Sequence, residues 1–122
     1  MNTIRTFRDL IAWQKAMGMV QTVYEISSVL PDAERYGLIS QMRRAAISIP
    51  SNIAEGYARQ SLRDYIKHLR IARGSLAELM TQLELATMLK YIPLDQYPTE
   101  RIEEVDRILQ GLIRSLESQS IP

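Results

Sequence analysis

The chain has 122 residues, a formal net charge of +1 and no cysteine. This length predicts one domain, residues 1–122, with room for a hydrophobic core. The absence of cysteine excludes disulfides, thiolate metal sites and cysteine nucleophiles, and the single histidine, His68, excludes a histidine-rich metal cluster within one chain.

The sequence shows no membrane or secretion signal. No apolar run approaches the roughly 18 to 20 residues that a membrane-spanning helix needs. The first residues, M-N-T-I-R-T-F, lack the apolar core of a signal peptide. We therefore expect a cytoplasmic protein that has no membrane partner.

Charged residues are unevenly distributed along the chain. Residues 40–75 carry seven basic and two acidic side chains, whereas residues 76–122 carry four basic and eight acidic ones. The middle segment is therefore +5 and the C-terminal segment −4. Such a split indicates either an anionic partner for the middle segment or complementary faces in self-assembly.

Four amphipathic helices are expected, the first at about residues 6–29 and the second at about 31–58. Thr6 and Asp9 form a capping box at the start of the first helix. Its apolar stripe is predicted at Leu10, Trp13, Met17, Val20 and Tyr24. Pro31 separates the two helices, because a residue before proline is disfavoured in helical geometry and proline itself suits a first helical turn.

The third helix is expected at about residues 62–90 and the fourth at about 99–118. Ser61 and Asp64 form a capping box before the third helix. Its apolar stripe steps by three and four through Leu62, Tyr65, Leu69, Ala72, Leu76, Leu79, Leu83 and Ala86. The fourth helix repeats this pattern at Ile102, Val105, Leu109, Leu112 and Leu116. Four such helices with short links predict an all-α, antiparallel, up-down-up-down four-helix bundle.

Residues 41–59 combine a helical apolar pattern with features that a plain soluble helix lacks. Pro50 predicts a local kink, which either fits the bundle or aims the turn from Asn52 to Glu55 at a partner subunit. The polar residues here either face water or form a buried or interfacial network, with Arg43, Arg44 or Arg73 as candidate partners of the carboxylates. The residues assigned to structural or interface roles are Pro50, Asn52, Glu55, Gly56, Ser75 and Glu78.

A basic stripe follows one side of the third helix. Arg59, Arg63, Lys67 and Arg70 recur at steps of four, four and three, with no acidic residue on the same stripe. Such a stripe is either a solvated face or a surface that contacts phosphates. The residues expected to bind nucleic acid are Arg43, Arg44, Arg59, Arg63, Lys67, Arg70 and Arg73.

Two tyrosines, Tyr57 and Tyr65, lie close to this basic stripe in the sequence. Aromatic side chains among cations can stack on bases. Tyr65 also falls on the apolar stripe of the third helix, so core packing is its expected role.

The sequence contains no recognisable catalytic constellation. It lacks a Glu-x-x-His iron motif and a glycine-rich phosphate loop, and no nucleophile has a plausible base. We therefore expect a protein that is not an enzyme and that uses no metal or cofactor.

Three segments carry a resemblance to a known family: L-I-A-W-Q-K-A at residues 10–16, E-R-Y-G-L-I-S-Q-M-R-R-A-A-I-S-I-P-S-N-I-A-E-G at 34–56 and A-R-G-S-L-A-E-L at 72–79. Over about residues 7–117 the chain resembles the small four-helix-bundle proteins encoded within intervening sequences of bacterial 23S ribosomal RNA genes. A similar bundle is the accessory protein of diversity-generating retroelements. That bundle forms a basic pentamer, binds nucleic acid and works with a reverse transcriptase.

The resemblance implies a homo-oligomer, with the pentamer as the family expectation. It also implies an accessory product of an inserted element rather than a component of the ribosome. The partners that it suggests are further copies of the chain, RNA or DNA, and a reverse transcriptase or another protein.

Two hypotheses on function follow. The first is an oligomeric bundle that binds nucleic acid, most readily RNA, through its basic residues. The second is a structural or protein-interaction scaffold whose arginines pair with the acidic fourth helix of a neighbouring subunit. The acidic residues that distinguish the two by their position are Asp95, Glu100, Glu103, Glu104 and Asp106.

Overall fold

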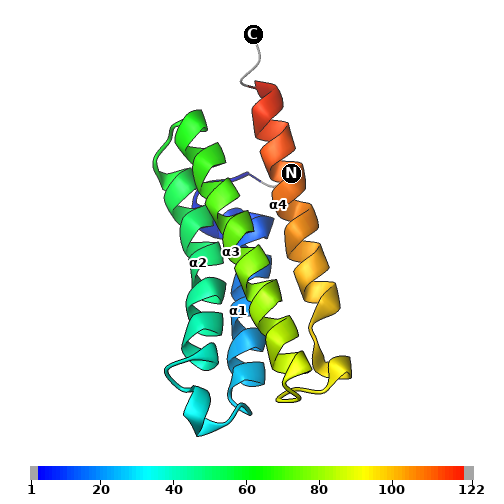
Figure 1. Ribbon diagram of the computed structural model, residues 1–122. Coiled ribbons are helices and arrows are strands. Elements are labelled where there is room, and N and C mark those ends of the chain that lie inside the picture. The colour runs from blue at the N-terminus through cyan, green and yellow to red at the C-terminus, as the bar shows by residue number, and fades with distance from the viewer. Residues whose placement is uncertain (1–2, 120–122) are drawn as a thin grey trace.

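The computed structural model describes residues 3–119 of the chain. Within this range it contains four α-helices and three short 3-10 helices, and no strand (Figure 1). The α-helices are α1 (Ile11–Ser27), α2 (Leu38–Ala58), α3 (Leu62–Met88) and α4 (Thr99–Gln119), and the 3-10 helices are η1 (Phe7–Asp9), η2 (Asp32–Glu34) and η3 (Leu94–Gln96). The prediction of an all-α chain of four helices is confirmed.

Consecutive helices run in opposite directions and lie side by side (Figure 1). Each α-helix contacts the next one along the chain, and α4 also contacts α1, so the four helices enclose one core. The most extensive contact joins α2 to α3. The connection between α2 and α3 lies at the same end of the bundle as the C-terminal end of α4.

The apolar stripes of α2, α3 and α4 fill the core largely as the periodicity predicts. The fully buried side chains on these helices include Met42, Ile49, Ile53, Leu69, Leu76, Leu79, Leu83, Ile102 and Leu109. Leu62 and Tyr65 at the start of α3 are only half-buried. On α4, Leu112 is half-buried and Ile113 is buried in its place.

The predicted core stripe of α1 is confirmed only in part: Leu10, Trp13 and Val20 are half-buried against the core, and the neighbouring stripe is the fully buried one. Ala12, Ala16, Met19 and Val23 are buried, whereas the predicted core residue Met17 is 46% exposed. Two neighbouring stripes on this helix are apolar, and both repeat with helical spacing, so periodicity does not distinguish them. The small side chains of Ala12 and Ala16 occupy the core, and the larger side chains border a groove between α1 and α2.

The first two helices also begin later than predicted. The capping box of Thr6 and Asp9 is present, but it starts η1, after which Leu10 is extended and α1 begins at Ile11. Pro31 precedes only the short η2, and α2 begins at Leu38, whose backbone N–H donates to Glu34 Oε1 at 3.1 Å. In each case the residues expected to start an α-helix start a short 3-10 helix instead, because both kinds of helix can begin with the same residues.

The remaining helix ends differ by one to two residues from prediction. α1 ends at Ser27, α3 ends at Met88 and α4 reaches Gln119. α2 continues through Pro50, and this proline is buried.

Candidate nucleic-acid interface

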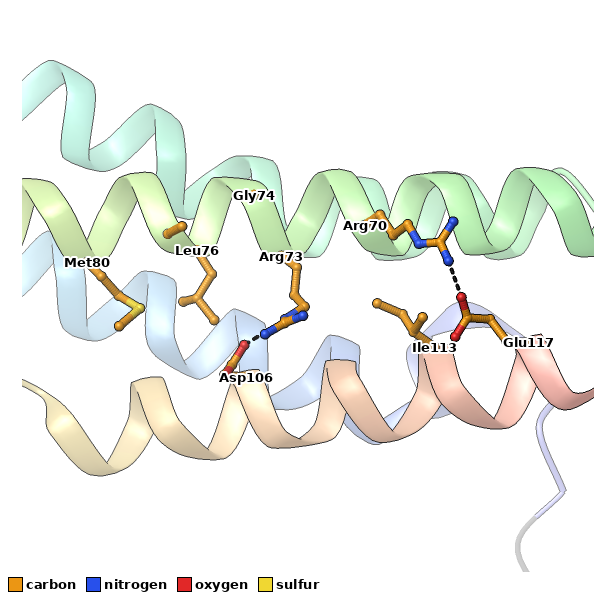
Figure 2. Close-up of a pocket in the computed structure, with 9 residues that line it drawn as sticks. Arg70, Arg73, Gly74, Leu76, Met80, Asp106, Ile113 and Glu117 are labelled. Carbon is orange, nitrogen blue, oxygen red and sulfur yellow. Dashed lines mark hydrogen bonds and ion pairs between the residues drawn. The ribbon is translucent and has the colours of Figure 1, made fainter.

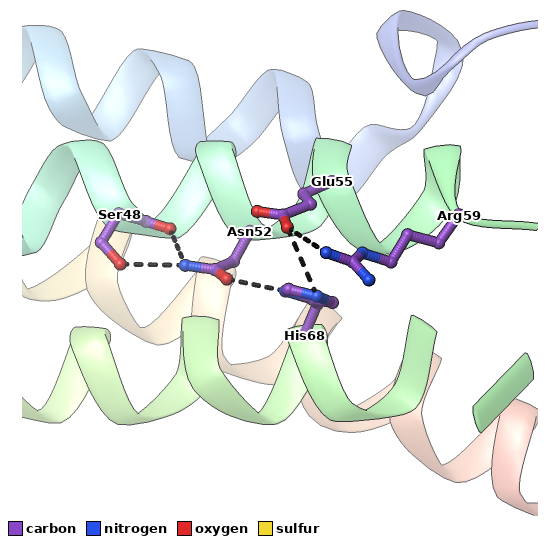
Figure 3. Close-up of polar contacts among 5 residues, drawn as sticks. All are labelled: Ser48, Asn52, Glu55, Arg59 and His68. Atoms are coloured by element: carbon purple, nitrogen blue, oxygen red, sulfur yellow. Dashed lines mark hydrogen bonds and ion pairs between the residues drawn. The ribbon is translucent and has the colours of Figure 1, made fainter. Parts of the chain in front are cut away.

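A polar network crosses the contact between α2 and α3 (Figure 3). The Asn52 side-chain amide donates to Ser48 O at 2.8 Å and to Ser48 Oγ at 3.0 Å. Its Oδ1 lies 2.9 Å from Nδ1 of His68, and because Oδ1 only accepts, Nδ1 carries the proton. The buried Ser75 bonds to Ser48 at 2.8 Å. Of the two arrangements left open for Asn52 and Ser75, a network is the one that forms, and it joins two helices of one chain.

Glu55 lies at the solvent edge of this network. Its carboxylate accepts from Arg59 at 2.9 Å and lies 3.7 Å from Nε2 of His68. The hydrogen bond from Arg59, followed by the charge of His68, lowers the pKa of Glu55 below its ordinary value. Within the described chain Glu55 pairs with Arg59, one helical turn away, rather than with the candidates Arg43, Arg44 or Arg73.

Gly56 sets the distance between α2 and α3. A Cβ atom at this position would lie 2.7 Å from Cβ of His68 and 3.3 Å from the carbonyl oxygen of Tyr65. Since neither contact leaves room for a methyl group, glycine permits the close approach of the two helices. Gly56 thus serves packing within the subunit. Glu78, by contrast, is exposed and has no ion pair within residues 3–119.

Arg43 packs against α1 rather than projecting into solvent. Its guanidinium lies 4.4 Å from the centre of the Tyr24 ring, and its Nε donates to Ser27 Oγ at 2.8 Å. Ser27 is fully buried, so this bond satisfies a hydroxyl group at the edge of the core. These contacts give Arg43 a structural role.

Arg70 and Arg73 bridge the groove between α3 and α4 (Figure 2). Arg73 Nε lies 2.9 Å from Asp106 Oδ1, and Arg70 pairs with Glu117. The groove has a volume of about 680 Å³, and its lining includes Leu76, Met80 and Ile113. Acidic residues of α4 therefore form ion pairs with arginines of α3. The second hypothesis expects such pairs between neighbouring subunits, whereas these two form within one chain.

Apart from Arg43, which packs against α1, three of the seven predicted basic residues form no ion pair within the described residues: Arg44, Arg63 and Lys67. All three are exposed. Arg63 and Lys67 lie on the first two turns of α3, whereas Arg44 lies roughly 20 Å away along α2 at about 1.5 Å per residue. The expected continuous basic surface is thus reduced to the start of α3.

A pocket of about 380 Å³ opens at this same end of the bundle. Its lining includes Tyr57, Tyr65 and, from the N-terminal segment, Arg5. The two tyrosine rings meet edge to face, with centres 5.8 Å apart and planes at 80°. Burial, with a smaller contribution from Tyr57, raises the pKa of Tyr65 to about 12. We call this site, lined also by Gly56, Gln60, Ser61, Leu62, Leu116 and Gln119, the end pocket.

The end pocket is not predicted by the sequence patterns. Arg5 and Leu116 are far from Tyr57 in the sequence, so only the path of the chain brings them together. The one available signal was the pair Tyr57 and Tyr65 beside the basic stripe. That signal is ambiguous, because Tyr65 also matches the apolar stripe of the third helix.

A second, apolar groove lies between α1 and α2. It has a volume of about 370 Å³ and is lined by Trp13, Met17, Val20, Ile47, Pro50, Ser51 and Ala54. Met17 and Ile47 are 46% and 43% exposed. Pro50 thus faces this groove, whereas Asn52, two residues later, lies on another side of α2 and joins the polar network with α3. No charged side chain lines the groove among the residues described.

Over residues 3–119 the fold and these sites define a helical bundle in which cations without an ion pair lie beside an aromatic pocket. Within residues 3–119, no three or more His, Cys, Asp or Glu side chains are grouped to hold a metal ion, and no helix has the length and apolarity to cross a membrane.

The chain belongs to the 23S rRNA-intervening sequence protein family, whose model matches residues 8–113. The resemblance drawn from the sequence is thereby confirmed. A crystal structure of a protein of unknown function from the S23 ribosomal protein family of Bacteroides thetaiotaomicron is 25% identical, with a TM-score of 0.77. The match covers 84% of this chain and 98% of that one. No curated protein matches the chain significantly.

Proposed function

We propose that this protein binds nucleic acid, with RNA as the preferred form, and does so without catalysis. The observation that carries the proposal is the set of cations at the α2–α3 end of the bundle, Arg5, Arg63 and Lys67, none of which has an ion pair within residues 3–119. Such cations are free to replace the counterions of a phosphate backbone. Arg59 lies beside them, although Glu55 neutralises it.

The arrangement supports recognition of the backbone rather than of a base sequence. Arg63 and Lys67 are four residues apart and therefore lie on the same side of α3. Cations that contact phosphates position a nucleic acid but carry no sequence information. Binding is therefore expected to be independent of sequence and to weaken steeply with salt.

Fluorescence anisotropy with a labelled single-stranded RNA, measured over a salt series, tests this proposal. The double variant Arg63→Gln/Lys67→Gln should reduce the magnitude of the slope of log affinity against log salt by about 1.4, since each single-strand phosphate contact contributes about 0.7. The matched control is Arg70→Gln/Arg73→Gln, which removes two charges that are already paired and should leave the slope nearly unchanged. Absence of RNA or DNA retention by the wild-type protein at low salt would refute the proposal.

A second candidate function is self-assembly through the apolar groove between α1 and α2. We propose as its occupant the outer side of α3 from a second copy of the chain. Ile71 and Leu85 are 42% and 39% exposed on that side, and a Cβ at Gly74 would meet no atom within 4 Å.

Charge complementarity supports this pairing. Arg44 lies one turn before Ile47 on the groove side of α2, and Glu78 lies between Ile71 and Leu85 on α3. Neither has an ion pair within the described part of its own chain. Because groove and stripe are different surfaces, the contact is head-to-tail, and such contacts close into rings when the rotation permits. A ring of five is the family expectation.

Light scattering at micromolar concentration tests assembly. The wild-type protein should show several subunits, and Met17→Glu/Ile47→Glu should show one helical subunit. Arg44→Glu should weaken assembly, and Glu78→Arg in the same chain should restore it. A monomeric wild-type protein, or a charge exchange that restores nothing, would contradict this arrangement.

A further inference from the structure

The end pocket has the composition of a site for a flat ligand with polar edges. Its walls come from the end of α2, the start of α3, the end of α4 and the N-terminal segment. At about 380 Å³ it lies within the range of small-ligand sites, roughly 300–1,000 Å³. Leu62 and Leu116 add apolar surface, and Gln60 and Gln119 add amide groups that both donate and accept. A nucleobase matches this combination, since its faces are apolar and its edges are polar.

The two tyrosines supply an aromatic surface for such a base. Tyr57 and Tyr65 are both half-buried and are held edge to face, 5.8 Å between ring centres. Proteins that take up single-stranded RNA stack unpaired bases on aromatic side chains in this way, and every base has a face that can stack. A base inside a duplex is not available for this contact.

Among residues 3–119 the hydroxyl group of Tyr65 has no hydrogen-bond partner. Its oxygen is buried, and no described atom bonds to it. An unsatisfied buried hydroxyl is uncommon in native proteins and calls for a reason. Gln60, beside it in the lining, holds the left-handed backbone conformation with φ of 56°, which is uncommon for a residue other than glycine. Both features coincide in one pocket, and a ligand edge that reaches the hydroxyl would satisfy it.

Positive charge lies where the phosphates of a bound nucleotide would emerge. Arg5 lines the pocket itself, and Arg63 follows Leu62 in the first turn of α3. The N-terminus of this 27-residue helix adds the positive end of its dipole, although Asp64 in the first turn opposes part of it.

From these observations we propose that the end pocket takes up one unpaired nucleobase, stacked on Tyr57 and hydrogen-bonded to Tyr65, with the flanking phosphates held by Arg5 and Arg63. The inference rests on the proposed nucleic-acid function and makes it specific for single strands. Arg70 and Arg73 have no part in this contact.

The experiment uses a 12-nucleotide RNA of uridines with one central 2-aminopurine, alone and annealed to its complement. The fluorescence of 2-aminopurine falls when the base stacks on an aromatic ring. The wild-type protein should bind the single strand more tightly than the duplex and should quench the single strand. Tyr57→Leu should abolish the quenching and weaken binding about tenfold or more, as expected for loss of one stacked base.

Tyr65→Phe provides a second test, in which a loss of RNA affinity can be distinguished from a loss of stability. It removes a hydroxyl that has no hydrogen-bond partner in the described part of the chain, so the melting temperature should hold or rise while RNA binding weakens about three- to tenfold. Tyr36→Leu is the matched control, because Tyr36 is 88% exposed at the opposite end of the bundle and should change neither property.

The outcomes separate this inference from the function on which it rests. If neither strand form binds, the nucleic-acid function and the pocket inference both fail. If single strand and duplex bind equally without quenching, the protein binds nucleic acid and the pocket inference is wrong. Wild-type RNA affinity in Tyr65→Phe would likewise overturn the proposed contact to the hydroxyl.

Discussion

The groove between α3 and α4 and the end pocket both contain arginines, but the charge of these arginines is used differently. In the groove, Arg73 meets Asp106 at 2.9 Å and Arg70 meets Glu117. In the end pocket, Arg5 and the neighbouring Arg63 have no ion pair within residues 3–119. An arginine-rich stretch is therefore not a binding surface in itself. An arginine is available to a ligand only if helix packing brings no carboxylate of the same chain within ion-pair distance of it.

The largest expected effect concerns the buried phenol of the end pocket. Burial raises the pKa of Tyr65 to about 12, so between pH 10 and 12 the unfolded chain releases this proton and the native protein keeps it. The contribution of this group to stability is therefore complete below pH 10 and is lost as the pH rises through this window. Because the side chain is only half-buried and solvent screens its charge, we expect a loss of roughly 1 to 2 kcal/mol, less than the full linkage value. Urea unfolding from pH 9 to 12 measures the loss.

Tyr65→Phe isolates this effect from other tyrosines, since the pKa of Tyr91 and Tyr97 is also raised. The variant should lose stability less steeply than the wild-type protein over the same pH range. Identical pH profiles for the two proteins would show that the phenol is not buried in solution.

The next largest effect is the change in stability when a glycine is replaced by alanine, at Gly56 in the end pocket and at Gly74 in the groove between α3 and α4. Gly56→Ala should destabilise the protein by about 1 to 2 kcal/mol, because the new methyl group would lie 2.7 Å from Cβ of His68 and overpack the contact between α2 and α3. Gly74→Ala on the groove side should stabilise it by about 0.5 to 1 kcal/mol, since its Cβ meets nothing and alanine favours a helix. Thermal melts of the isolated variants compare the two, and equal shifts would contradict the packing described here.

Removing the carboxylates from the groove should convert it into a second basic surface. In Asp106→Asn/Glu117→Gln, Arg73 and Arg70 lose their partners, so RNA affinity at low salt should rise severalfold. The salt slope should steepen by up to about 1.4, equivalent to two additional single-strand phosphate contacts. Anisotropy over a salt series measures both, and Glu100→Gln/Glu103→Gln serves as a control for a nonspecific gain of positive charge. If the control gains as much as the test variant, the ion pairs in the groove do not matter for binding.

The smallest effect is the stability contributed by one groove ion pair. Arg73 and Asp106 have side-chain exposures of 46% and 33%, and pairs that remain solvated contribute about 0.2 to 1 kcal/mol. Arg73→Gln should therefore lower stability by less than about 1 kcal/mol, with the difference vanishing at high salt. A larger loss, or one that salt leaves unchanged, would mean that the pair is more buried than the structure shows.

Most of the fold follows from patterns that are local in the sequence. The stripes of α3 and α4 repeat over many turns, and long repeats specify a helix and its buried side together. The start of α2 was less predictable, because Pro31 and the acidic residues after it suit a 3-10 turn as well as an α-helix. For α1, two neighbouring stripes are apolar, and the sequence does not show which of them is buried. The stripe with Ala12 and Ala16 lies in the core, where small side chains let the other helices come close.

The sequence by itself determined that this chain is four amphipathic helices of one family, with a surplus of positive charge near the start of the third. It did not determine which of these basic side chains are paired with carboxylates and which remain available to bind a phosphate. Arg70 lies 47 residues from Glu117, and Arg73 lies 33 from Asp106. Only helix packing brings these groups into contact, since Coulomb attraction and hydrogen bonding depend on distances in space. Packing likewise placed Arg5 beside Tyr57 and Tyr65, and so created a pocket that no single stretch of the chain contains.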